Sequence, residues 1–474
     1  MASEPKSGGL TGAQPSVTPL PPVGAIDDDV AEIPSWRKWV ILFVVCWMPL
    51  PMTFWSTAIM PATPEVASDL DIAVTTINTV NAGVFVAQAL SGLIWLPIST
   101  IIGRRSTYLV ANLVLCLCSI GCAVAPNIAG FGALWILGGT TGPFFLVAGQ
   151  TILADIFEPA TPLIGSIIAT FTSWRVIYGV EAGMSCLGLI LTFFFIPRAS
   201  EVGNPKTAEA IRPKTREDMI RTFNPMIVFR QFKYPKVLLA NIACGLLAFN
   251  QYGLLSSVRR VVNPRFNLNS PLESGLFYLA PGAGFLVGST LGGKVSDITV
   301  RRYIRKRNGQ RLPEDRLNAS LPFILLVLPL GTLLYGWSVQ KRIGSMALPI
   351  VGSFIQGTGL MASFSGLNTY AAEVRPVYRT AVITGKYVVQ YSFAAGSVGG
   401  VVPLINGLGV GWAFTISDYI RDHYQWHACC ADFQIQQNME AINSGKWLDN
   451  SPSSLPSSRA QEMAETGYDN EKSA

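Results

Sequence analysis

Two ionisable side chains interrupt long apolar stretches of the sequence. Glu181 lies in VIYGVEAGMS, and Lys386 lies in TGKYVVQ. Ionisable residues inside membrane segments are costly and are therefore functional candidates. A carboxyl group in such a position is suited to carrying a coupling proton, and we predict this role for Glu181, unless it simply reaches water near its helix end. Lys386 can either extend along its stem toward water or neutralise an anionic substrate.

Uncharged polar residues recur in the same apolar stretches. Their amides and phenols can bind a ligand that is partly polar and partly aromatic, or they can join helices to one another. With Lys386, the predicted residues of a substrate cavity are Gln88, Gln150, Asn250, Gln251, Tyr252, Gln356, Asn368, Tyr370, Gln390 and Tyr391.

The elements that must position these residues are long apolar helices. The chain is 50% hydrophobic and 14% charged, and spanning a bilayer core takes roughly 20 apolar residues in a helix. We predict an all-α polytopic membrane protein with ten clear transmembrane runs: 40–60, 77–98, 107–125, 131–154, 176–196, 237–257, 273–293, 319–339, 346–370 and 381–406.

No nucleophile–base pair or metal-ligand set occurs within these runs, so we expect neither enzyme activity nor a cofactor or metal. GSTLGGKV (Gly288–Val295) resembles the start of a phosphate-binding loop, but Val295 stands where such a loop needs Ser or Thr. We therefore exclude ATP as the energy source. The four-residue spacing of Gly284, Gly288 and Gly292 instead suits close helix packing in lipid.

Loop charge predicts the orientation of the chain. The loop 61–75 is acidic, whereas Arg104-Arg105, the segment 198–236 and GGKVSDITVRRYIRKRNGQRLPEDRL (Gly292–Leu317) are basic. Basic loops face the cytosol, so the formal net charge of +6 does not indicate nucleic-acid binding. The predicted parts are a disordered cytosolic tail 1–35, bundles 36–197 and 237–417 joined by the basic linker 198–236, and a polar tail 418–474.

Several motifs carry a resemblance to a known family. ISTIIGRR (Ile98–Arg105) and GGKVSD followed by Arg301-Arg302 resemble the loop signature of the major facilitator superfamily. With DIFEP, SWRVIY, FNP and GVGW, the sequence over about residues 36–417 resembles the fungal drug:proton antiporters. The resemblance implies the major facilitator fold, with two helical bundles that rock about a central cavity.

It further implies that small organic molecules, such as drugs, toxins or secondary metabolites, leave the cell in exchange for protons. A monomer in the plasma membrane is expected. Alternatives with the same fold are an organic-anion exporter or facilitator, and a transport-incompetent relative with a structural or regulatory role. The resemblance also assigns a conformational latch on the cytosolic side to Asp297, Arg301, Arg302, Arg104 and Arg105.

The sequence departs from the family pattern at several positions. Thr100 stands at the family's Asp position, and Trp135 stands where many relatives have a buried Arg. The fifth helix is reduced to 162–172, and the last runs into charged DYIRDHYQW. Either the short segment 160–172 crosses while buried among other helices, or the chain is a truncated or altered product.

Overall fold

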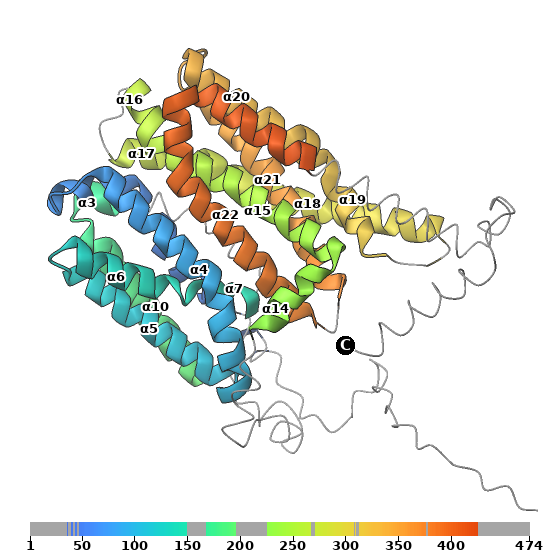
Figure 1. Ribbon diagram of the computed structural model, residues 1–474, viewed down its shortest axis with the longest axis horizontal. Coiled ribbons are helices and arrows are strands. Elements are labelled where there is room, and N and C mark those ends of the chain that lie inside the picture. The colour runs from blue at the N-terminus through green and yellow to red at the C-terminus, as the bar shows by residue number, and fades with distance from the viewer. Residues whose placement is uncertain are drawn as a thin grey trace, which may run out of the picture.

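The fold is helical throughout the part of the chain that the computed structural model describes (Figure 1). Described are residues 47–148, 167–195, 225–266, 271–307, 312–375 and 378–424, with a few single positions before residue 47 and Gly309. The predicted all-α membrane fold is confirmed, since nine helices in these ranges have the length and apolar composition to cross a bilayer: Val74–Ser99, Arg105–Val124, Ile128–Leu146, Arg175–Phe195, Pro235–Ser257, Gly275–Lys306, Glu314–Lys341, Ala347–Glu373 and Arg379–Leu408.

These nine helices coincide with nine of the ten predicted runs. The remaining run, 40–60, is described only in part, as α2 (Pro49–Thr57) and a 3-10 turn (Met60–Ala62). The predicted tail 1–35 lies outside the described residues. Residues 160–166 of the short segment also lie outside the described residues. The prediction that the segment 160–172 crosses the membrane therefore concerns in part residues that the structure does not describe.

The first half is built from α2, a short outer helix α3 (Thr63–Asp69) and five further helices. These are α4 (Val74–Ile102), α5 (Arg104–Val124), α6 (Ile128–Gly139), α7 (Gly142–Ala148) and α10 (Arg175–Phe195). Gly103 connects α4 to α5 with a φ of 87°, a backbone conformation that glycine adopts at little cost.

An ion pair on the predicted outer side ties α3 to the start of α10. Arg175 donates a hydrogen bond to the carboxylate of Asp69, and Trp174 Nε1 donates to the same carboxylate at 3.2 Å. The hydrogen bond from Arg175 holds the pKa of the Asp69 carboxyl below its usual range. Because Asp69 is largely exposed, this pair fixes geometry more than it stabilises.

The second half begins with a short helix α14 (Met226–Arg230) inside the predicted linker. Its long helices are α15 (Pro235–Ser257), α18 (Leu279–Lys306), α21 (Ala347–Glu373) and α22 (Arg379–Leu408). A further span consists of α19 (Glu314–Pro322) and α20 (Leu328–Lys341), joined by one π-helical turn.

A last helix occupies residues 410–424 and crosses the predicted tail boundary at residue 418. Asp418 and Arg421 are 3% and 1% exposed, and Arg421 Nη1 donates to Asp418 Oδ1 at 2.5 Å. Because the two charges offset each other, the helix buries both. The sequence predicted a polar tail from residue 418 because charged residues indicate exposure when their pairing is not known.

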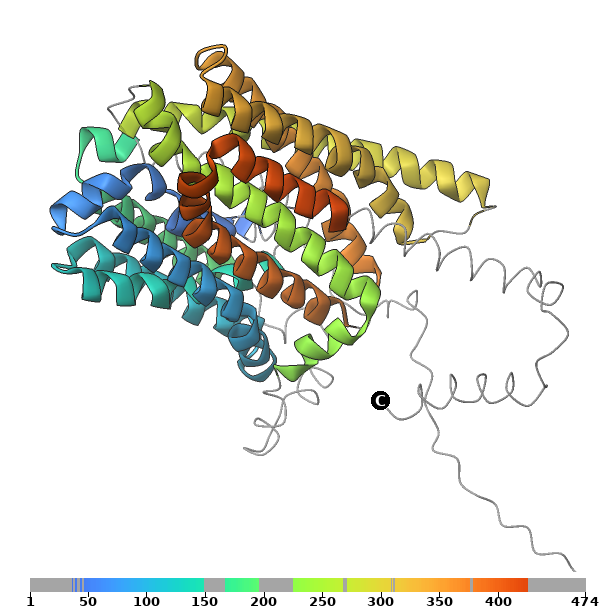
Figure 2. The same ribbon diagram turned by 45° about the horizontal axis from the view of Figure 1, so that its top comes forward.

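α4 of the first half lies beside α22 of the second half in both views (Figures 1 and 2). The ring of Phe85 contacts Tyr252 at a centroid distance of 4.7 Å and Tyr391 at 6.2 Å. A side chain at Gly92 would meet Thr384 Cγ2 at 2.5 Å. The two halves therefore meet through aromatic rings and through the Thr384 side chain, which packs against the backbone of Gly92.

The predicted glycine contact is confirmed between α18 and α21. A Cβ at Gly284, Gly288 or Gly292 would lie within 2.6 Å of α21 backbone, namely Phe354 O, Thr358 O or Ala362 Cα. Backbone atoms cannot rotate away as a flexible side chain can, so only glycine allows this separation.

We expect Gly288→Ala to destabilise the protein by about 1–3 kcal/mol, because the new methyl group collides with the carbonyl of Thr358. The measurement is thermal unfolding of the purified protein in one detergent. Gly293→Ala is the matched control: nothing lies within 4 Å of its Cβ position, and alanine has the higher helix propensity by about 1 kcal/mol. Equal melting temperatures for the two variants would contradict this packing.

Candidate functional site

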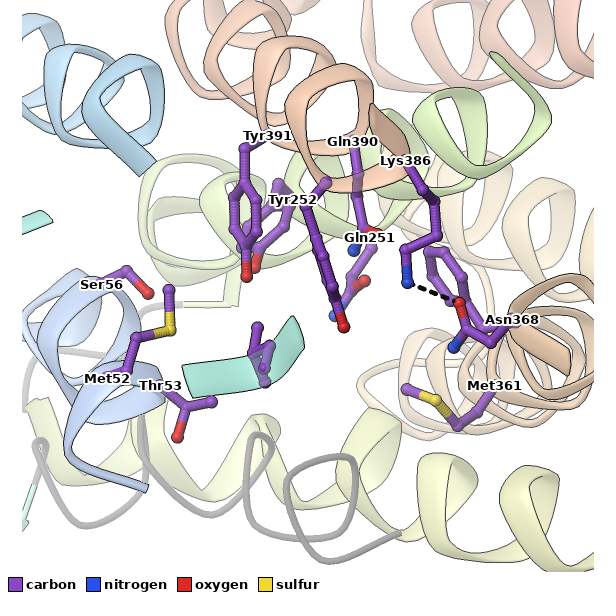
Figure 3. Close-up of a pocket in the computed structure, with 13 residues that line it drawn as sticks. Met52, Thr53, Ser56, Gln251, Tyr252, Met361, Asn368, Lys386, Gln390 and Tyr391 are labelled. Carbon is purple, nitrogen blue, oxygen red and sulfur yellow. Dashed lines mark hydrogen bonds between the residues drawn. The ribbon is translucent and has the colours of Figure 1, made fainter. Parts of the chain in front are cut away.

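A cavity of about 50 Å³ lies between the two halves (Figure 3). The first half contributes Met52, Thr53 and Ser56 from α2 and Leu146 from α7. The second half lines the rest of the wall with Gln251, Tyr252, Met361, Phe364, Asn368, Lys386, Tyr387, Gln390 and Tyr391. Its position between two bundles is that of a transporter's central binding site.

Six of the predicted cavity residues line this space: Gln251, Tyr252, Asn368, Lys386, Gln390 and Tyr391. They come from the consecutive helices α21 and α22 and from α15, about 90 residues earlier in the chain. Gln88, Asn250, Gln356 and Tyr370 are buried elsewhere, at 0–1% exposure. Gln150 lies outside the described residues.

Asn250 and Gln356 join helices instead of lining the cavity. Gln356 Nε2 donates to Asn250 Oδ1 at 2.7 Å, and Asn250 Nδ2 donates to Asp418 Oδ1 at 3.1 Å. Successive helix residues point about 100° apart, so Asn250 faces the last helix while Gln251 and Tyr252 face the cavity. This polar network stabilises the wall from behind.

Gln88 lies on α4, one turn after Phe85. It is fully buried, and neither its amide oxygen nor its amide nitrogen has a hydrogen-bond partner among the described residues. An unsatisfied buried amide is costly. Gln88 is buried in the bundle and does not line this cavity, although the sequence predicted it there.

Lys386 does not extend toward bulk water. Its residue exposure is 1%, and its ammonium group donates a hydrogen bond of 2.7 Å to Asn368 Oδ1. The same group lies 3.8 Å from the ring centroid of Tyr387, within cation–π range. Of the two sequence interpretations, the structure therefore favours a lysine directed into the cavity.

The sequence did not predict the apolar residues of the cavity wall. Met52, Leu146, Met361 and Phe364 are ordinary residues for a membrane helix, and nothing in their spacing separates a cavity wall from core packing. Thr53 and Ser56, three residues apart on α2, were the available signal, because residues at this spacing share a helix face.

Glu181 lies within the first half, not in the cavity wall. It is fully buried, and neither carboxylate oxygen has a hydrogen-bond partner among the described residues. The face of α10 that carries it packs against α5, where Asn112 Nδ2 donates to the carbonyl of Ser185 at 3.0 Å. The alternative that Glu181 simply reaches water is thus not what the structure shows.

α2 separates Glu181 from the cavity. Thr53 and Ser56 face the cavity, whereas Trp55 packs edge-on against Tyr178, one turn before Glu181, at 5.7 Å. Trp55 Nε1 donates to the Trp135 carbonyl at 3.0 Å, and Trp135 Nε1 donates back to the Trp55 carbonyl at 3.2 Å. Trp135 therefore locks α6 to α2.

In the second half, Asp297 of the predicted latch pairs with Arg316 and not with the predicted Arg301 and Arg302. Asp297 lies 3.5 Å from Arg316 Nη1, and Arg316 Nε donates to Glu373 Oε1 at 3.2 Å. Arg301 and Arg302 are exposed and, within the described residues, form no ion pair. Arg301 and Arg302 do not pair with Asp297 because α18 continues to Lys306 and exposes both arginines on its surface.

In the first half, Arg105 joins the start of α5 to the end of α10. Its Nη2 donates to the carbonyl of Phe193 at 2.5 Å, and its guanidinium lies 5.8 Å from that ring. A cation at the carbonyl end of a helix is favourable. The side chains of Arg104 and Thr100 lie outside those that the structure describes.

Two helical bundles with a cavity at their interface are the architecture of a membrane transporter. The sequence model of the Major Facilitator Superfamily matches residues 50–161 and 159–400. The chain therefore belongs to the major facilitator superfamily.

Fungal transporters are among its relatives. The chain is 26% identical to the MFS-type transporter penM of Penicillium rubens, over 77% of this chain and 78% of that one. It is 25% identical to the MFS transporter cpaT of Aspergillus oryzae, covering 83% and 86%. It is 23% identical to the efflux pump radE of Floropilus chiversii, covering 83% and 80%.

Solved structures share the fold at low sequence identity. The xylose transporter XylE from E. coli, in a partially occluded inward-open conformation, matches with a TM-score of 0.58 and 12% identity, covering 83% of this chain and 98% of that one. The human organic anion transporter MFSD10 matches with a TM-score of 0.56 and 13% identity, covering 84% and 100%.

We expect Arg316→Gln to loosen the predicted cytosolic ends of α18 and α21, because both Asp297 and Glu373 lose their cation. Partly exposed ion pairs contribute about 0–1 kcal/mol each, so backbone amides there should exchange hydrogen up to about fivefold faster for each pair lost. Hydrogen–deuterium exchange with mass spectrometry measures this. Arg301→Gln is the control, because Arg301 lies on α18 and forms no ion pair within the described residues; an equal effect in both variants would reject Arg316 as the cation that joins these helix ends.

Proposed function

We propose that this chain is a proton-coupled exporter of small organic molecules, such as drugs, toxins or secondary metabolites. The observation that carries the proposal is the cavity lined by both halves, with polar, aromatic and charged side chains in an otherwise apolar bundle. The relatives described as transporters and as an efflux pump support the direction. We place the protein in the plasma membrane as a monomer.

Transport requires the halves to move, because the cavity is small. Sites for drug-sized ligands measure about 300–1,000 Å³, against about 50 Å³ here. The contact of Phe85 with Tyr252 and Tyr391 lies on the line along which the halves separate. Arg316 with Asp297 and Glu373 is the latch that opens and closes once in each cycle.

Glu181 is the proposed proton carrier. A carboxylate without hydrogen bonds in an apolar bundle is costly to ionise, so proton release must accompany a change in its surroundings. α2 provides the connection, since Trp55 contacts Tyr178 beside Glu181 while Thr53 and Ser56 line the cavity. Movement of α2 on substrate binding would alter the packing around the carboxyl group.

Two alternatives use the same structure. An organic-anion exporter or facilitator would bind its substrate in the same cavity, and the structural neighbour MFSD10 is described as an organic anion transporter. A transport-incompetent relative would show no flux at all. Flux against a concentration gradient separates the exporter from both a facilitator and an incompetent relative.

The test uses proteoliposomes with an imposed pH gradient and two radiolabelled probes, N-acetyltryptophanamide, which is neutral, and N-acetyltryptophan, its carboxylate counterpart. Glu181→Gln should lower gradient-driven accumulation about tenfold, within the usual range of coupling between sites, and leave gradient-independent exchange intact. Ser185→Ala, one turn along the same buried face, should retain both.

Unchanged gradient-driven accumulation in Glu181→Gln would remove this residue as the proton carrier. Absence of gradient-dependent flux of both probes in the unmodified protein would contradict the proposed exporter.

A further inference from the structure

The cavity contains a charge that its predicted function does not by itself explain. Among the described residues that line it, Lys386 carries the single formal charge. The other lining side chains are amides, hydroxyls, thioethers, aromatic rings and one leucine. A single positive charge among polar and apolar groups bears on the chemistry of the substrate, provided the cavity is the substrate site proposed above.

The ammonium group of Lys386 is fixed in position by α21. It donates to Asn368 Oδ1 at 2.7 Å, as the dashed line in Figure 3 marks. Lysine has three N–H donors and no acceptor, and this bond engages one of them. Because the residue is 1% exposed, the effective dielectric constant is low and its attraction for an anion is correspondingly strong.

Asn368 adds a second donor beside the ammonium group. Its amide oxygen accepts from Lys386, which assigns the other terminal atom as the NH₂ group. An ammonium and an amide N–H next to each other match the two oxygens of a carboxylate, and bonds to a charged acceptor are about twice as strong as neutral ones.

The rest of the wall suits an apolar or aromatic body. Met361 lies near Asn368 on α21, and Met52 lies across the cavity on α2 (Figure 3). Methionine side chains adapt to irregular shapes and contact aromatic rings favourably. Tyr387 and Tyr391 stack at a centroid distance of 6.1 Å and present a further aromatic surface.

We propose that the substrate is an amphipathic organic monoanion, whose carboxylate binds Lys386 and Asn368 and whose aromatic or aliphatic body contacts the methionines and tyrosines. The structural alternative is a lysine that only joins α22 to α21 through its bond to Asn368. The two roles of Lys386 predict different results: only an anion-binding lysine gives the protein a preference for negatively charged ligands, whereas either role can affect its stability.

The experiment measures binding to the full-length protein in detergent by isothermal titration calorimetry. Its probes share one indole body: N-acetyltryptophan is the monoanion, N-acetyltryptophanamide is neutral, and tryptophanamide is the monocation. We expect the monoanion to bind about tenfold more tightly than the neutral probe, and the monocation to bind most weakly.

Lys386→Gln should abolish the preference for the monoanion while the neutral probe binds within about twofold of its original affinity, and Lys386→Arg should keep part of the preference. Lys341→Gln, which removes an exposed lysine at the end of α20, should change neither ratio. Thermal unfolding of each variant identifies a fold defect independently.

No preference for the monoanion in the unmodified protein, no binding of any probe, or an unchanged preference in Lys386→Gln would each overturn the inference. Gradient-driven flux without a charge preference overturns this inference alone. Monoanion binding without gradient-driven flux instead overturns the proposed exporter, so the two failures are distinguishable.

Discussion

The contact between α4 and α22 is the interaction on which the arrangement of this protein depends. Gly92 leaves room for the side chain of Thr384 from α22, and the ring of Phe85 packs against both Tyr252 and Tyr391 at the same interface. In lipid, helix association depends on close packing, since burial of apolar surface gives little advantage there. The cavity lies between the two halves that these contacts join.

The same constraint explains where the polar groups lie. Each helix satisfies its own backbone hydrogen bonds, as it must in a bilayer, so only side chains specify contacts between helices. Hydrogen bonds of this kind join Asn250 to Gln356 and to Asp418. The hydrogen bond between Lys386 and Asn368 lies instead at the cavity. Polar residues of similar type therefore serve either packing or the site, according to the helix face they occupy.

α2 relates the candidate proton carrier to the cavity because its two faces have different neighbours. One face carries Thr53 and Ser56 into the cavity. The other places Trp55 against Trp135 and Tyr178, beside Glu181. Trp135 has a structural role here: its indole N–H donates to the backbone carbonyl of Trp55, and the indole N–H of Trp55 donates to the backbone carbonyl of Trp135.

The sequence by itself determined the class of protein, because twenty-residue apolar runs and basic loops are local properties that a bilayer sorts directly. It also indicated that the glycine face of 284–292 packs closely against another helix, since the glycine spacing is visible in the chain. Only the tertiary structure decided that α21 is that helix and which polar residues meet. Asn250 and Gln251 are neighbours in sequence, yet Asn250 bonds to Asp418 on another helix and Gln251 lines the cavity. Arg316 replaces Arg301 and Arg302 at Asp297. These outcomes depend on the rotation of one helix against another, and that rotation is set by packing between residues far apart in the chain.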